Sequence, residues 1–121
     1  MSNAVFNVSV GIGALSNANR PVFKVPSEYG GITLVGAQAV QAGVGTVGLY
    51  LVDLGSAGTA VGGTLGSFGT VYATNVPNEA TLTSPFVDAG SYIGVKEANV
   101  GAANTVTIVS FQYVMGKAES A

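Results

Sequence analysis

Residues 105–115 read TVTIVSFQYVM, and this stretch decides the fold. Its side chains alternate with the period of two that is typical of a β-strand. One side of the strand carries Val109, Phe111, Tyr113 and Met115. The other side carries Val106, Ile108, Ser110, Gln112 and Val114. Since both sides are substantially apolar, we expect a central strand, or one whose outer face a neighbouring subunit covers. The first of these two rows is the candidate interface.

The same alternation recurs towards the amino end of the chain. Phe6, Val8, Val10 and Ile12 fall on one face of a predicted strand over residues 6–12, with polar residues and glycine on the other face. A shorter run at 22–25 is bounded by Pro21 and Pro26. Because proline cannot donate to a β-ladder, this run is predicted to be an edge strand or a strand end.

The middle of the chain predicts strands separated by glycine-rich connections. Runs at 32–41 and 46–53 are joined by Ala42-Gly43-Val44-Gly45, whose composition favours a hairpin, so we expect these two strands to pair antiparallel. Residues 55–69 contain six glycines and are predicted to form a mobile loop or irregular edge before a strand at 70–74.

Two further segments complete the predicted strands. Residues 81–86 alternate and include Pro85, which again favours an edge, and 88–90 form a turn before a strand at 91–97. No stretch shows a helical apolar stripe with capping residues. About eight short strands predict a single all-β domain over residues 1–121, an antiparallel β-sandwich or jelly roll, with a short tail at 117–121.

Charged side chains are scarce. They make up 8% of the chain, which has a net charge of −2, no histidine and no cysteine, while 48% of its residues are hydrophobic. About a quarter of the residues in an ordinary domain are charged. Two long stretches, 29–52 and 54–78, contain none. Such a surface is expected to be covered by protein, either other copies of the chain or a larger assembly.

The same composition argues against several functions. Without histidine or cysteine, the usual catalytic triads and zinc sites are unavailable, so we predict no enzyme activity, no cofactor and no metal. The four basic residues, Arg20, Lys24, Lys96 and Lys117, are too scattered for nucleic-acid binding. The glycines in residues 29–52 argue against a membrane span. Residues 43–48 (GVGTVG) match the glycine pattern of a dinucleotide-binding site, but they lead into a predicted strand, whereas such a site needs a helix.

One binding function stays open beside the structural one. Sugar-binding β-sandwiches stack ligands on exposed aromatic rings, and Tyr29, Tyr50 and Tyr72 are the candidate glycan contacts. The alternative interpretation is that these tyrosines are boundary residues with a buried ring and a solvated hydroxyl.

The last third of the chain also resembles a known group of proteins. Residues 86–101 (FVDAGSYIGVKEANVG) and 105–116 (TVTIVSFQYVMG) are similar to the ends of small β-sandwich virion proteins of tailed bacteriophages. The resemblance implies a structural role in the virion, as a capsid decoration or tail protein. It also implies that the chain assembles with itself and with other virion proteins such as the major capsid protein. It transfers no binding residue.

Overall fold

The computed structural model describes residues 4–12, 19–42, 46–58, 62–72, 77–98 and 106–116. Every regular element in these residues is a β-strand. The strands are β1 (Phe6–Ile12), β2 (Asn19–Lys24), β3 (Ile32–Ala42), β4 (Thr46–Asp53), β5 (Gly63–Tyr72), β6 (Asn78–Glu79), β7 (Thr81–Leu82), β8 (Phe86–Val87), β9 (Tyr92–Ala98) and β10 (Val106–Met115).

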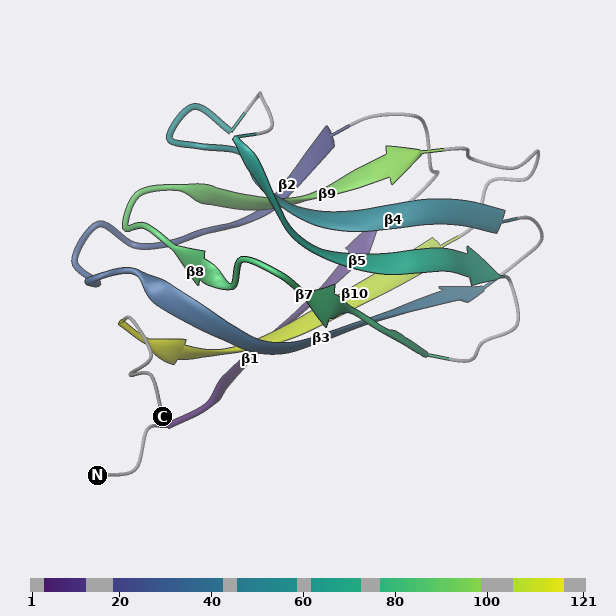
Figure 1. Cartoon of the computed structure of the whole chain (residues 1–121), viewed down its shortest axis with the longest axis horizontal. Coiled ribbons are helices and arrows are strands. Elements are labelled where there is room, and N and C mark those ends of the chain that lie inside the picture. Colours follow the sequence, from purple (N-terminus) through teal and green to yellow (C-terminus); the bar gives the residue numbers. More distant parts are fainter. Residues whose placement is uncertain are drawn as a thin grey trace.

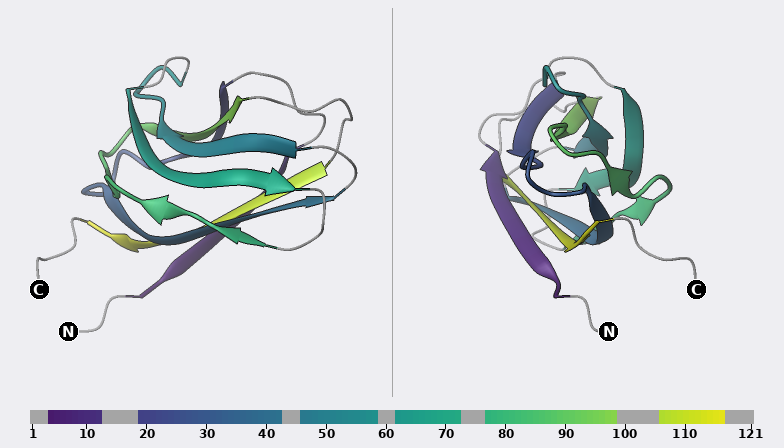
Figure 2. Two further views of the ribbon diagram at one scale, coloured as in Figure 1. Left: turned by 45° about the vertical axis from the view of Figure 1, so that its right-hand side comes forward. Right: turned by 90° about the vertical axis from the view of Figure 1, so that its left-hand side faces the viewer.

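Two sheets pack face to face, as Figure 1 shows. Sheet A has the order β1-β10-β3-β6, with β8 also paired to β3, and sheet B has the order β2-β9-β4-β5-β7. All the pairings are antiparallel. If β6, β7 and β8 are taken as one interrupted strand, this is the strand order of an eight-stranded jelly roll. The predicted fold class is confirmed, and the two layers separate clearly in Figure 2.

Alternation along each strand builds the core between the sheets. In β1 the even-numbered residues pair with core residues of β10, Val8 opposite Phe111 and Val10 opposite Val109. From sheet B, Leu49, Leu51, Ile93 and Val95 meet them, all fully buried. Burying one such side chain stabilises the fold by about 1.5–3 kcal/mol, so the alternating rows hold the two layers together.

The predicted hairpin between 32–41 and 46–53 is wrong, although both strands exist. β3 belongs to sheet A and pairs with β10, whereas β4 belongs to sheet B and pairs with β5 and β9. Residues 43–45, on which the hairpin prediction relied, lie outside the described residues. Glycine-rich composition permits a tight connection, but which strands pair depends on contacts far away in sequence.

The second half of the glycine-rich segment, from Gly63, is a strand where a mobile loop or irregular edge was predicted. β5 pairs with β4 from Gly63 onwards, through two register shifts that leave Leu65 and Phe68 as extra residues on β5. Both side chains point into the core and are 3% exposed. β-Bulges thus convert the apolar period from two to three, which hides the strand from a test for alternation.

The segment 77–87 forms an edge, as predicted for residues 81–86, and joins the two sheets along one side. β6 and β8 pair with β3 of sheet A, and β7 pairs with β5 of sheet B. A Cβ on Gly66 would lie 2.8 Å from the carbonyl oxygen of Thr81, so glycine at this position allows β7 to approach β5. β2, which contains Pro21, is an edge strand of sheet B, as its prolines predict.

Candidate functional site

The row of β10 residues predicted to be the interface points into the core, and the opposite row points outwards. Val109 and Phe111 are fully buried between the sheets, and Tyr113 is 6% exposed. Phe23 of β2 lies 5.6 Å from the ring of Phe111 and 5.8 Å from that of Tyr113, both between centroids. Because these three side chains are used by the chain's own core, assigning them to an interface placed the partner on the wrong side of β10. Only Met115, at the strand end and 42% exposed, is open to a partner.

The side of β10 that is open to a partner belongs to the outward face of sheet A. We call it the uncharged face. No charged residue occurs anywhere in β1, β10 or β3, which are adjacent in the sheet. Its members, from their pairing and burial, are Asn7, Ser9, Gly11, Gly36, Gln38, Ile108, Ser110 and Gln112, with Val35.

Uncharged polar side chains on this face bond to one another across two strands. The Gln112 amide Nε2 donates to Asn7 Oδ1 at 2.6 Å, and the Asn7 amide Nδ2 donates to Ser9 Oγ at 3.2 Å. The hydroxyls of Ser9 and Ser110 lie 2.8 Å apart in a further hydrogen bond. A partner covering this face would bury polar groups that already have bonds, which costs less than burying unpaired ones.

Exposed apolar residues gather on the same sheet. The large hydrophobic residues most open to solvent in the described part of the chain are Val5, Phe6, Val35, Tyr50, Ile108 and Met115, and all but Tyr50 lie on β1, β3 or β10 or directly before β1. Val35 is 51% exposed because a register shift leaves it as an extra residue on β3. Ile108, in the central strand of the face, is 48% exposed.

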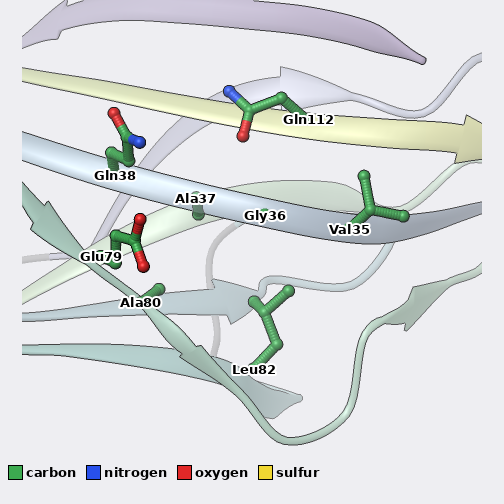
Figure 3. Close-up of a pocket in the computed structure, with 8 residues that line it drawn as sticks. All are labelled: Val35, Gly36, Ala37, Gln38, Glu79, Ala80, Leu82 and Gln112. Atoms are coloured by element: carbon green, nitrogen blue, oxygen red, sulfur yellow. The ribbon is translucent and has the colours of Figure 1, made fainter.

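A groove of about 310 Å³ runs along the border of the uncharged face, between β3 and the segment 79–82 (Figure 3). Gln38 and Gln112 lie on the sheet side, and Glu79 and Leu82 lie on the opposite side. Gly36 keeps its floor open, since a Cβ there would be 2.9 Å from Gln112 Oε1. With a single carboxylate, the groove has no second acid or base within it for proton transfer.

The outer face of sheet B is different in composition and is partly covered by its own chain. Lys96 and Tyr50 are paired across β9 and β4 on this face. Leu54 follows β4, and its side chain is the one nearest to the place where a side chain at Gly94 would be. Gly58 lies against the ring of Tyr92, which also has Lys24 Nζ 5.6 Å from its centroid. Segment 54–58 thus covers part of this face.

One ion pair is enclosed at the β2 edge. Arg20 Nε lies 2.8 Å from Glu97 Oε2, and the side chains are 34% and 0% exposed. Glu97 falls on the inward row of β9 with Ile93 and Val95. The pair joins β2 to β9 and leaves the carboxylate occupied, so it has the features of a structural contact.

No cluster of potential metal ligands occurs in the part of the chain that the structure describes. Nor does that part contain a helix long and apolar enough to span a bilayer.

Of the three candidate glycan-binding tyrosines, the structure describes the side chains of Tyr29 and Tyr50, and these two lie in different places. Tyr29 packs against the core, and Tyr50 is 36% exposed on the outer face of sheet B. Tyr72 ends β5, where its backbone pairs with Thr46, four residues from Tyr50 along β4. The side chain of Tyr72 lies outside the described residues. Tyr29 and Tyr50 therefore provide no shared stacking platform.

Comparison with known proteins gives a likeness in structure. No family model and no curated protein matches the sequence. A chain of the capsid asymmetric unit of cyanophage Pam1 is similar with a TM-score of 0.58 and 21% identity, over 92% of this chain and 83% of that one. A desmodium yellow mottle tymovirus chain has a TM-score of 0.36 and 12% identity, over 100% of this chain and 92% of that one. The first likeness supports the jelly-roll fold.

Proposed function

We propose that this chain is a non-enzymatic structural protein of a virus particle, and specifically a decoration protein that binds the outside of a phage capsid. The observation that carries the proposal is the uncharged face, three adjacent strands of a jelly roll with no charge and with exposed Val35 and Ile108. The likeness to a chain from a cyanophage capsid supports the same class of protein.

The uncharged face suits permanent contact with protein better than exposure to water. Its polar groups are amides and hydroxyls that bond to one another, so covering them requires no desolvation of ions. The exposed apolar side chains on the same side of the sandwich supply the surface whose burial favours association. We infer that this face lies against other virion proteins, such as the major capsid protein.

A single charge at the centre of the face tests the proposal. Ile108→Lys adds an ammonium group at an exposed position of the central strand, so the fold is retained. Docking should weaken by about tenfold or more, because the capsid would bury this ammonium group without an opposite charge beside it. Thr64→Lys is the matched control, because Thr64 is exposed on β5 of sheet B. The measurement is binding of each purified variant to phage particles that lack the protein, by co-sedimentation.

The expected result is saturable binding of the wild type and Thr64→Lys to the capsid and loss of binding by Ile108→Lys. Heat or low salt should disrupt particles that lack the protein sooner than decorated ones. Equal binding of all three proteins would overturn the docking face. Wild-type protein that neither binds particles nor changes their resistance, or that labels only the tail, would overturn the decoration role.

A further inference from the structure

The residues that the structure describes leave one sheet edge open. β3 is bordered by β6 and β8, β5 is bordered by β7, and β2 carries Pro21 and a register shift within its run. Proline, bulges, charges and covering segments are the devices by which proteins protect sheet edges. Within the described parts of the chain, β1 has none of them. It has seven residues, no charge and no proline, and none of the described residues pairs with its outer edge.

We propose that the free edge of β1 pairs antiparallel with β1 of a second copy of this chain, about a twofold axis through Ser9. An exposed strand edge has unpaired N–H and C=O groups that another strand can satisfy. The pairing does not depend on the proposed place of the protein in a virus particle.

The sequence of β1 fits itself under this rotation. FNVSVGI is close to symmetric about Ser9, with Val8 and Val10 on either side, then Asn7 and Gly11, then large apolar residues at both ends. Antiparallel pairing about Ser9 sets Val8 opposite Val10 of the other copy and Asn7 opposite Gly11. Core-side residues then meet core-side residues, as a twofold interface requires.

The surface beside β1 is complementary in the same register. At one end of the strand Phe6 is 43% exposed, with its other side stacked on Tyr113 at 5.4 Å between centroids. At the other end a hollow of about 290 Å³ lies between β1 and β2, lined by Val10, Gly11, Ile12, Asn19, Arg20, Pro21 and Val22. The rotation sets Phe6 of each copy opposite Ile12 of the other, beside this hollow.

Pairing would also enlarge the uncharged face. The order β3-β10-β1 in one copy would continue as β1-β10-β3 in the second. The resulting six-stranded surface contains no charged residue, since none occurs in these strands. Partly exposed Val8 and Val10 would become interior residues of the joined sheet.

Cysteine cross-linking tests the register directly, because the natural chain has no cysteine. Residues opposite each other across two strands have Cα atoms about 4.5–5.5 Å apart, which is within the range of a disulfide. Ser9→Cys is therefore expected to form a covalent dimer under mild oxidation. Asn7→Cys is the matched control on the same strand and face, since the two Asn7 residues would be roughly 14 Å apart.

Charge reversal tests the same contact without a covalent bond. Ser9→Lys sets two like charges opposite each other and should weaken dimerisation by about tenfold or more, and Ser9→Asp should do the same. Mixing the two variants should restore the dimer. Ser110→Lys is the control, because β10 lies one strand away from the edge and its two copies would be roughly 14 Å apart, beyond the screening length.

The measurement is sedimentation equilibrium over a range of concentrations. We expect the wild type to be a dimer and Ser110→Lys to be one as well. Ser9→Lys alone and Ser9→Asp alone should be monomers, and a mixture of these two variants should form a dimer. A wild type that stays monomeric would overturn the inference. So would a dimer that Ser9→Lys leaves intact, or one that Asn7→Cys cross-links as readily as Ser9→Cys. Ser110→Lys changes the uncharged face as well, so a variant that dimerises but fails to bind particles separates this contact from the docking proposal.

Discussion

The outer faces of the two sheets differ although both sheets are built by the same antiparallel alternation. Sheet B carries Lys24 and Lys96 and is partly covered by segment 54–58, whose Leu54 side chain is 2% exposed. Strands β1, β10 and β3 of sheet A carry no charge, and none of the segments described here covers their outward side chains at Val35 and Ile108.

The two outer faces therefore differ in whether the single chain covers them. Sheet B has an outer face that carries charged residues and that segment 54–58 of the same chain partly covers. Strands β1, β10 and β3 of sheet A leave Val35 and Ile108 exposed and contain no charged residue, which a soluble monomer seldom does over a continuous surface. Changes in sheet B should therefore alter the stability of the chain, and changes on the uncharged face should alter assembly.

The largest expected effect is on the covered side. Leu54→Ala removes a buried side chain that packs over Gly94, so the free energy of unfolding should fall by about 2–5 kcal/mol. Ile108→Ala on the uncharged face should change it by less than about 0.5 kcal/mol, because nearly half of that side chain is exposed. Denaturant titration measures both. Equal losses for the two variants would contradict the contrast between the faces.

Two glycines provide a smaller and more local comparison. Ala at Gly94 would place its Cβ 2.7 Å from the backbone oxygen of Arg20 and against the Leu54 side chain, so Gly94→Ala should destabilise the fold by about 1–3 kcal/mol. A Cβ at Gly11, on the outward side of β1, meets nothing within 4 Å. Gly11→Ala should therefore leave the free energy of unfolding within about 0.5 kcal/mol of the wild type.

Combining variants tests whether the Leu54 contact causes the difference. If the strain in Gly94→Ala arises at Leu54, the double variant Leu54→Ala/Gly94→Ala should lose less free energy of unfolding than the two single variants together. Additive losses would show that the backbone of β2 alone resists the added methyl group.

Strands with a regular period were predictable from the sequence. Residues 6–12, 91–97 and 105–115 show their alternation locally, and each is found within a residue or so of its predicted bounds. The part of β5 before residue 70 was missed because bulges at Leu65 and Phe68 break the period. The partners of β3 and β4 could not be predicted, since pairing between strands far apart in sequence depends on the whole core.

The candidate site shows a similar limit. The scarcity of charge predicted a covered surface, but both faces of β10 are apolar enough to point inwards, so alternation alone could not tell which one does. The polar residues Ser110 and Gln112 were the available signal, because β1 has Asn7 and Ser9 on the matching face. Their cross-strand hydrogen bonds identify the outward side only once the β1–β10 register is known.

The smallest expected effect is electrostatic and belongs to sheet A. Tyr113 is the one titratable side chain in β1, β3 and β10. Burial, with a further contribution from Tyr29, raises its pKa above the ordinary value of 10.0. Since the folded chain holds this proton when the unfolded chain has released it, unfolding becomes more favourable as the pH rises above about 10.

Tyr113→Phe removes that proton equilibrium while keeping the ring that packs against Phe6 and Phe23. Thermal unfolding between pH 8 and pH 11 should show a shallower alkaline loss of stability in Tyr113→Phe than in the wild type. Tyr50→Phe removes the same hydroxyl from sheet B, where the side chain is 36% exposed, and serves as the comparison. If Tyr50→Phe flattened the slope and Tyr113→Phe did not, the alkaline sensitivity would belong to sheet B. The uncharged strands would then contribute no pH dependence.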